Sequence, residues 1–588
     1  MSSPFLSRMS RRRLIRSVGV GGVGIAGTAL IGCSASQSPA PAGGSSGAPV
    51  NQATATTAQP KQGGIWRSQI INDPTNIDIV VEPSGNVQAA HNPVYSRLMK
   101  WKSGPKIEPS SVMEGDAVKS WEAGDGKTWT FKLREDLKFH PKPPVNGRQA
   151  DSEDVKTSFE RFIKVSPGRK TLVDLVDKVE TPDKTTVVFK LKENYPGFAE
   201  VLTGSLGLFV YSKEANTGVI DPQKVDGAIG TGPWMMKSRQ PSIAIEFERH
   251  PEWHIKDAEG RKLPYMAGWR ALIIPEYAQG IAQFAAGQLT TFVPKTEDAE
   301  GLLQRVPKAQ ILAEPPADGH SFYAFHQETA SNVMRDVRLR RAWSMAIDRK
   351  TLMDVFGQFD KAKKLGYTLQ GPIGNTPIPA GDGMKYWYLD PYSDKQGPSR
   401  KWFEFNTAEA KKLVQAAGYD GRKITVHSPS PAWLPTGEAQ VPMLKEAGFN
   451  PQLNVMEYSQ YVGGPYSGKG TWEVAYGNMS AWPTVDETLM NLMVPGGLRN
   501  MPALSDKVPD YTKVGDLIKK QRTEANREAR RELVHEIQRL SADQMWYVPS
   551  INNRWGTLSF AQPNVRNYGQ YQGSQVPTET VPYYWFES

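Results

Sequence analysis

The chain has few of the residues from which disulfides, metal sites and membrane spans are built. It contains one cysteine and eight histidines in 588 residues. Beyond residue 32 it has no run of 18 apolar residues, the length that suggests a membrane span. A single thiol excludes an intramolecular disulfide. The absence of a long apolar run leads us to expect a soluble body.

Excess charge of one sign is also scarce. The formal net charge is +9, and five arginines lie within the first 16 residues, where there is no acid. The rest of the chain is therefore close to neutral, and its charge gives no reason to expect a nucleic-acid partner. A chain this long exceeds one hydrophobic core and predicts two or three domains.

The N-terminus reads as an export signal. Ser10 to Arg16 contains the pair Arg11 and Arg12, followed by one further residue, two apolar residues and a base, which fits the twin-arginine export pattern. The glycine-rich apolar stretch that follows, up to Ile31, is too short to cross a bilayer as a helix. A disordered basic tail or a weak transmembrane helix is the alternative interpretation.

A lipid anchor is predicted directly after this signal. Leu30 to Cys33 resembles the lipobox of bacterial lipoproteins, in which the Cys33 thiol receives a diacylglycerol. Residues 33–62 are rich in Ser, Ala, Pro, Gly and Thr, and such a segment predicts a flexible tether. We therefore expect a protein anchored at the outer face of the cytoplasmic membrane, in the extracytoplasmic or periplasmic space.

Local patterns in the body interleave strands with helices. Alternating apolar residues predict a strand over 129–133. Asp151 can cap a helix that carries Val155, Phe159 and Phe162 on one face. A second helix is predicted from Asn406, with a glycine at its C-terminal end. No repeat of fixed period is present, so we expect an α/β body.

Several motifs carry a resemblance to a known family. They are Gly63 to Trp66, Asn92 to Leu98, Ser120 to Arg161, Gly230-Thr231-Gly232-Pro233-Trp234, His250 to Trp253 and Val337 to Arg349. In this order they resemble the family 5 extracellular solute-binding proteins, which include the dipeptide-, oligopeptide-, nickel- and some oligosaccharide-binding proteins of ABC importers. The resemblance implies a two-lobed periplasmic-binding-protein (Venus flytrap) fold with a third, inserted subdomain and a hinge of two crossing strands.

The same resemblance divides the chain into segments. They are the signal peptide 1–32, the tether 33–62, the first lobe 63–84, the inserted subdomain 85–216, the first lobe again 217–318, the second lobe 319–548 and the first lobe once more 549–588.

Motifs that suggest catalysis or a cofactor are weak. Gly463 to Lys469 imitates a phosphate-binding loop, but Gly470 stands where the loop needs Ser or Thr, and the next residues read as a strand. His250 and His254 have the spacing of metal ligands on a helix, but Pro251 disfavours that helix. We expect no enzyme activity, no cofactor and no metal site.

The predicted ligand class depends on one position at which this sequence departs from the family pattern. In peptide-binding members an Asp pairs with the α-amino group of the peptide, and Trp482 takes that position here. A tryptophan face suits a sugar ring, so an oligosaccharide is predicted somewhat ahead of a peptide. The alternative is that Asp486 takes the role of the displaced acid. The remaining candidate ligand contacts are Asn478, Ser480, Thr484, Asp73, Trp433 and Tyr466.

The function predicted on this basis is solute capture for an ABC importer. The protein would act as a monomer, with a membrane permease and its ATPase subunits as partners. A sensor or chaperone with the same fold is the alternative, and an enzyme on this scaffold is a weaker third.

Overall fold

The computed structural model describes most of the chain beyond the predicted signal and tether. The described residues are 59–83, 85–102, 112–204, 207–314, 319–369, 371, 373–381, 384–428, 434–480, 482, 484–551, 556–569 and 579–587. Arg11, Arg12, Cys33 and Trp433 lie outside them, so the export signal, the lipid anchor and one candidate ligand contact stay predictions.

The motif Gly63 to Trp66 leads into the first strand of a four-stranded sheet. Its strands, in spatial order, are β1 (Ile65–Ile70), β10 (Gly268–Ile273), β9 (Ala244–Arg249) and β8 (Trp234–Gln240). β1 runs parallel to β10, and the other pairs are antiparallel. Trp66 and Trp269 are cross-strand partners whose ring centroids lie 4.7 Å apart. Both indoles are buried, so this sheet has an aromatic inner face.

A second four-stranded sheet is antiparallel throughout. Its order is β4 (Val118–Ala123), β5 (Thr128–Leu133), β7 (Thr186–Leu191) and β6 (Val176–Asp183). Helix α3 (Ser152–Val165) packs against β6 and β7 and buries Val155, Phe159 and Phe162. Asp151 and Asp154 form a reciprocal capping box at its start, as the cap predicted at Asp151 requires.

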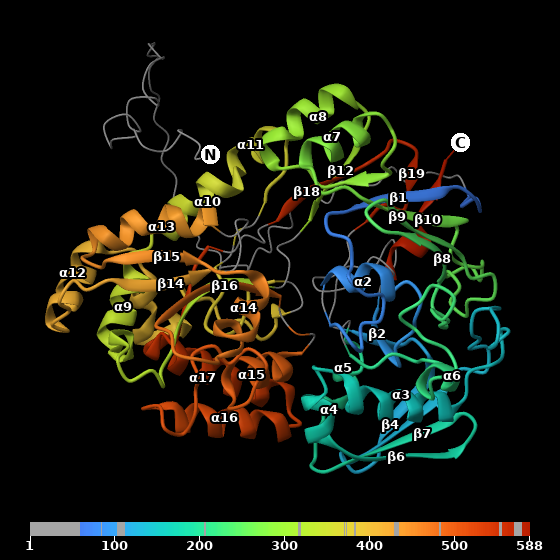
Figure 1. Ribbon diagram of the computed structural model, residues 1–588, viewed down its shortest axis with the longest axis horizontal. Coiled ribbons are helices and arrows are strands. Elements are labelled where there is room, and N and C mark those ends of the chain that lie inside the picture. Colours follow the sequence, from blue (N-terminus) through green and yellow to red (C-terminus); the bar gives the residue numbers. More distant parts are fainter. Residues whose placement is uncertain are drawn as a thin grey trace, which may run out of the picture. The chain divides into compact units, whose positions relative to one another are not determined.

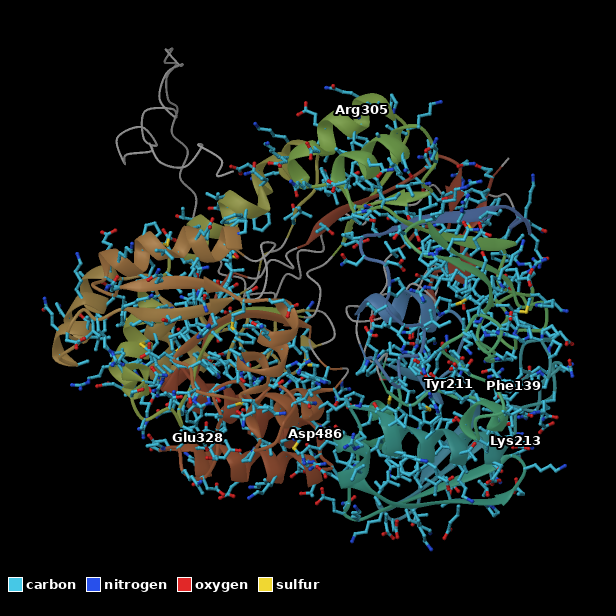
Figure 2. All side chains as sticks on the ribbon, viewed as in Figure 1. Phe139, Tyr211, Lys213, Arg305, Glu328 and Asp486 are labelled. Carbon is cyan, nitrogen blue, oxygen red and sulfur yellow. The ribbon has the colours of Figure 1, made fainter. Side chains whose placement is uncertain are left out.

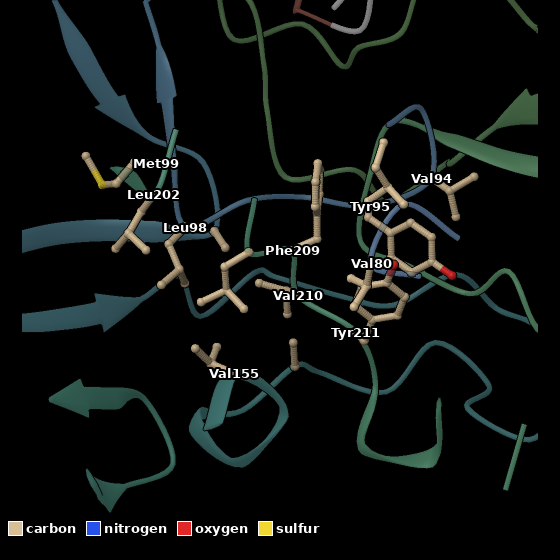
Figure 3. Close-up of a cluster of buried hydrophobic side chains, with 14 of the residues drawn as sticks. Val80, Val94, Tyr95, Leu98, Met99, Val155, Leu202, Phe209, Val210 and Tyr211 are labelled. Carbon is tan, nitrogen blue, oxygen red and sulfur yellow. The ribbon is translucent and has the colours of Figure 1, made fainter. Parts of the chain in front are cut away.

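These two sheets share one apolar core. Figure 3 shows part of it, where Val94, Tyr95 and Leu98 lie near Phe209 and Tyr211. The Gly-Thr-Gly-Pro-Trp motif packs directly on this region. A Cβ on Gly230 would stand 2.1 Å from the Val94 carbonyl oxygen. The motif therefore needs glycine because another stretch of backbone passes too close for any side chain.

A three-stranded sheet joins distant parts of the chain. It consists of β11 (Thr291–Phe292), β18 (Thr557–Ala561) and β12 (Gln310–Glu314), with β18 in the middle and antiparallel to both neighbours. One face buries Ile311, Leu558 and Phe560 in a core shared with α7 (Tyr277–Ala285), α8 (Ala299–Arg305) and α11 (Phe359–Lys364).

The largest sheet has five strands. Its order is β15 (Pro451–Val455), β14 (Ile424–Ser428), β16 (Val474–Ser480), β13 (Gly319–Phe325) and β17 (Tyr547–Pro549). Alternation along β13 divides its side chains between two cores. Tyr323 and Phe325 pack with α9 (Val337–Met345) and α12 (Thr407–Ala416). Phe322 and Ala324 pack with α15 (Val485–Met493), α16 (Tyr511–Thr523) and α17 (Arg527–Gln544) on the other face.

Shorter elements complete the described chain. They are α2 (Gly85–His91), β2 (Met99–Trp101), β3 (Met113–Gly115), α4 (Lys170–Leu175), α5 (Phe198–Val201), α6 (Lys213–Asn216), α10 (Arg349–Gly357), α13 (Leu434–Glu446), α14 (Tyr458–Gly463), β19 (Val565–Arg566) and β20 (Trp585–Phe586), together with 3₁₀ turns at Thr296–Asp298, Val333–Arg335, Asp394–Phe403, Pro465–Ser467 and Val581–Tyr583. None of the helices in the described ranges combines the length and the apolar character that a membrane span requires.

The arginine that ends the last family motif is structural. The Arg349 side chain is buried, and its guanidinium donates to the carbonyl oxygens of Ser344, Phe403 and Pro549 at 2.7–3.0 Å and to the Ser344 hydroxyl at 2.7 Å. These acceptors belong to α9, the 3₁₀ turn at Asp394–Phe403 and β17. Arg349 thus fastens three elements through groups that would otherwise be buried without donors.

Candidate functional site

The directions of the strands bring several carboxyl ends to one edge of the five-stranded sheet. The chain also passes between this sheet and the three-stranded sheet at that edge. β14 is parallel to β15 and β16, while β13 is antiparallel to β16 and β17. The carboxyl ends of β14, β15, β16 and β17 therefore lie at one edge, together with the first residue of β13. Figure 1 shows β14, β15 and β16 side by side. In α/β sheets the carboxyl ends of the strands are where ligands bind.

Two links between the five-stranded and three-stranded sheets leave from this edge. The chain passes from β12 to β13 through residues 315–318 and returns from β17 to β18 through residues 550–556. Helix α11 also packs in the core of the three-stranded sheet, so the chain reaches that core from a third place as well. The hinge of two crossing strands implied by the sequence stays a prediction.

Several predicted ligand contacts belong to this edge by backbone position. Asn478 and Ser480 are in the last three residues of β16, paired with Ser321 and Gly319 of β13. Trp482 follows two residues later and is partly buried against the apolar cluster on the α15–α17 face. Trp433 belongs to the segment after β14, which lies outside the described residues.

Tyr466 lies on the same side of the sheet as Trp482. Its ring centroid is 5.4 Å from that of Tyr461, and the Arg499 guanidinium carbon stands 4.3 Å from the ring centroid. Tyr466 packs, like Trp482, against the α15–α17 cluster. Both aromatic residues thus pack against one cluster, and their contact with ligand stays a prediction.

Two other candidates have structural partners. Thr484 is the N-cap of α15, and its hydroxyl accepts a 3.1 Å hydrogen bond from the backbone NH of Glu487. Asp73 accepts from the Arg239 guanidinium at 3.3 Å and from the Ser242 backbone NH at 2.7 Å, which ties its loop to the β8–β9 hairpin. Both side chains are thus engaged in local structure.

Asp486 is buried in a polar contact between distant segments (Figure 2). Its Oδ1 accepts a 2.6 Å hydrogen bond from the Gln521 amide, and its Oδ2 accepts a 3.0 Å bond from the Tyr195 hydroxyl. The Arg522 Nε lies 3.4 Å from Oδ2. Asp486 therefore joins α15 and α16 to the loop after β7, and in this structure its charge is already balanced by protein.

The acid beside Asp486 feels the same buried surroundings. Burial, followed by the negative charge of Asp486, raises the pKa of Glu487 to about 8. Glu200 lies in the same region, and burial raises its pKa as well. These carboxyl groups hold their protons more tightly than usual, because ionising all of them would place like charges together out of water.

One acid at the end of β12 was missed by the sequence analysis. Glu314 is the last residue of β12, directly before the first crossing, and its Cα partner is Thr557, the first residue of β18. Burial raises the pKa of Glu314 to about 7, although hydrogen bonds from the Ser559 and Thr557 side chains oppose the shift. The signal available in the sequence was a single acid at the end of an apolar strand, followed by two prolines.

The motifs that imitate catalytic sites have structural roles. His250 Nδ1 lies 3.2 Å from the Gly232 carbonyl oxygen, and burial lowers the pKa of His250 to about 4. His254 lies beside Asp116 at 3.4 Å. No group of three or more His, Cys, Asp or Glu in the described ranges could hold a metal ion. The glycine loop at Gly463 to Lys469 is followed by β16 and not by the α-helix that a phosphate-binding loop needs.

The chain was compared with known protein families and with known proteins. The model of the bacterial extracellular solute-binding proteins, family 5, matches residues 112–498. The "Probable D,D-dipeptide-binding periplasmic protein DdpA" of Escherichia coli is 25% identical over 422 residues, which cover 69% of this chain and 73% of that protein.

Solved structures agree on the fold. The periplasmic binding protein DppA of Helicobacter pylori, in complex with the peptide STSA, aligns over 90% of this chain and 99% of its own, with a TM-score of 0.71 and 19% identity. AgaA of A. tumefaciens R10, in complex with agropinic acid, aligns over 89% of this chain and 99% of its own, with a TM-score of 0.71 and 18% identity. The α/β binding-protein fold predicted from the sequence is confirmed. The chain belongs to the bacterial extracellular solute-binding proteins, family 5.

Proposed function

We propose that this protein captures a small solute, with a short peptide ahead of an oligosaccharide, and delivers it to a membrane permease driven by ATPase subunits. The observation that carries the proposal is the meeting of the strand ends of the five-stranded sheet with both chain crossings. A solute bound there touches both sides of a hinge, so binding can favour the closed arrangement.

The order of the two ligand classes reverses the sequence-based preference. The curated relative is named for a dipeptide, and the two solved structures hold a peptide and agropinic acid. Fold alone admits more than one ligand class, so a ligand screen has to decide between them. We place a peptide first because the curated relative is named for a dipeptide and one of the two solved structures holds a peptide.

The remaining assignments are part of the same proposal. Trp482, Tyr466, Asn478 and Ser480 are proposed ligand contacts on the second lobe. The segment boundaries given above are the proposed lobes, supported by the strands that each sheet draws from distant segments. Lipid attachment at Cys33 and a monomeric state complete the proposal. A sensor or chaperone without transport is the alternative, and a neighbouring permease gene would argue against it.

A ligand screen tests the proposal. Purified protein is heated with di- to penta-peptides and with α- and β-linked oligosaccharides, each at the same concentration. A ligand at 100 times its dissociation constant stabilises by about 2.7 kcal/mol and raises the melting temperature. Small-angle scattering of the same samples should give a smaller radius of gyration with the ligand that stabilises.

The outcomes separate the ligand classes. Peptides that stabilise and compact the protein support the proposal. Stabilisation by oligosaccharides alone, lost in Trp482→Ala, would restore the order favoured by the sequence, since a stacking contact contributes about 1 kcal/mol beyond its area. Proven binding with an unchanged radius would count against closure around the solute.

A further inference from the structure

Arg522 lies where two separately packed parts of the chain meet. It belongs to α16, which packs with α15 on the five-stranded sheet. Its Nη1 lies 3.6 Å from Glu193 Oε1, and its Nε lies 3.4 Å from Asp486 Oδ2. Glu193 follows β7, in the part of the chain whose core contains Tyr195. One guanidinium therefore stands between an acid of its own part and an acid of the other part.

The two acids differ in how far water reaches them. The Asp486 side chain is 0% exposed, whereas 47% of the Glu193 side chain is exposed. Asp486 also accepts a hydrogen bond from Gln521, the residue before Arg522. If the two parts separate, Asp486 keeps both of these α16 partners, and the Glu193 carboxylate passes into water. Separation therefore strands no buried charge, which would be the costly outcome.

The contacts of Arg522 are long enough to change partner. Both exceed the roughly 2.7–3.2 Å of an N–H···O hydrogen bond, and Nε has no hydrogen-bond partner within the described part of the chain. Arg148 is the opposite case, although it too is shared between a buried acid, Asp154, and a more exposed one, Glu214. Each of those carboxylates accepts two hydrogen bonds at 2.6–3.1 Å, and the helices that carry them, α3 and α6, pack together in one part. Arg148 is therefore fixed, whereas Arg522 can move between its two acids.

We propose that Arg522 is a positioning residue of solute capture, which pairs with Asp486 alone in the open arrangement and lies between Asp486 and Glu193 in the closed one. This inference rests on the proposed function, because it needs the two parts to separate and close. Helix α15, which carries Asp486, begins three residues after Trp482. Arg522 thus holds the start of the helix that follows the proposed ligand contacts. An exposed ion pair contributes little free energy, so a bound solute can decide between the two arrangements.

Distance measurements between two spin labels test this role. The labels are attached through Lys178→Cys on β6 and Lys519→Cys on α16, both at exposed positions, in a chain whose own cysteine is removed by Cys33→Ala. This labelled chain is the reference, and it is measured without solute, with trialanine and with maltotriose. It should give a short and a long distance, and a solute that binds should favour the short one.

One substitution removes the charge that the closed arrangement adds. Glu193→Gln should lower the ratio of short to long distances by up to about fivefold, the effect of an exposed ion pair. Glu214→Gln, which removes the matching acid beside Arg148, should leave the ratio unchanged. Raising NaCl to about 1 M should lower the ratio more in the reference and in Glu214→Gln than in Glu193→Gln, because salt screens exposed charges. Glu193 is half exposed and outside both cores, so Glu193→Gln should fold, which its melting temperature checks.

The outcomes separate this inference from the broader proposal. A ratio that Glu193→Gln leaves unchanged, or that Glu214→Gln lowers equally, would overturn the role of Arg522 and leave closure around a solute intact. Two distances whose ratio depends on Glu193 but on neither solute would support the role of Arg522 and count against capture of these solutes. A single distance, the same in every variant and with both solutes, would overturn closure and this inference with it.

Discussion

Replacing Tyr195 by Phe removes one hydroxyl from a buried contact between two cores. The Tyr195 hydroxyl donates to Asp486 at 3.0 Å, and both side chains are buried. Tyr195 packs in the core of the two four-stranded sheets, whereas α15, which carries Asp486, packs on the five-stranded sheet. The contact therefore connects parts of the chain that each have their own core.

The expected magnitude follows from the remaining partners of Asp486. A hydrogen bond to a charged group contributes about 1.5–3 kcal/mol. In Tyr195→Phe, Asp486 still has the Gln521 amide at 2.6 Å and the Arg522 Nε at 3.4 Å. The free energy lost with the hydroxyl should therefore lie near the lower end of this range. About 1.4 kcal/mol is a tenfold change in an equilibrium. Tyr195→Phe should shift the balance toward the open arrangement by about tenfold and weaken ligand binding by up to that factor.

The chain offers a matched control for this substitution. Tyr211 donates to Asp78 at 2.7 Å, Asp78 is paired with Arg161, and the Arg161 guanidinium carbon lies 5.0 Å from the Tyr211 ring centroid. The Arg522 guanidinium carbon lies 5.5 Å from the Tyr195 ring centroid in the same manner. Tyr211 lies within the core of the four-stranded sheets, as Figure 3 shows.

Calorimetric titration and scattering distinguish the two variants. Tyr211→Phe should lower the melting temperature and leave ligand affinity and the radius of gyration unchanged. Tyr195→Phe should weaken binding and enlarge the ligand-free radius. Equal effects of both variants on affinity, or none from Tyr195→Phe, would refute the reasoning that this contact holds the closed arrangement.

Three further predictions concern stability and export. Because the pKa of Glu314 is raised from 4.5 to about 7, the folded state binds the proton more tightly than the unfolded state, and the free energy of unfolding should fall as pH rises between these values. Glu314→Gln should flatten this pH dependence. Urea unfolding at pH 8 should show the variant more stable by up to about 3 kcal/mol. Arg349→Met leaves buried carbonyl oxygens without donors and should lower the free energy of unfolding by about 3 kcal/mol, whereas an unchanged urea midpoint would mean that water replaces the guanidinium. In cell fractionation, Cys33→Ala should release the protein from the membrane, and replacing Arg11 and Arg12 by Lys should retain precursor in the cytoplasm; normal export of the Lys pair would exclude the twin-arginine route.

Local structure was predictable where neighbours in the sequence decide it. The cap at Asp151 and the apolar face of α3 were predicted and are confirmed. The helix predicted from Asn406 begins at Thr407, with the Asn406 side chain accepting from the Glu409 backbone NH, and Gly418 has the positive φ expected after a helix end. These features depend on a few consecutive residues and on the 3.6-residue period, so one sequence is enough to find them.

The family motifs were visible in the sequence, but the contacts that require their residues were not. The glycines of Gly230-Thr231-Gly232 are required because the backbone near Val94 passes against them. Arg349 ends a motif because its guanidinium gathers carbonyl oxygens from three elements. Both reasons are contacts between segments far apart in the chain, and no local pattern contains them.

The sequence by itself determined the family, the α/β class and the starts of single helices, because each of these is written in local order and periodicity. Only the tertiary structure decided what surrounds each buried acid. Asp486 looked like a free acid in a loop and is held by Tyr195, which lies 291 positions away. Glu314 was not singled out in the sequence, and its burial at the end of β12, opposite Thr557, raises its pKa to about 7. The charge balance of a buried carboxyl group depends on which distant side chains surround it, and folding alone brings those side chains together.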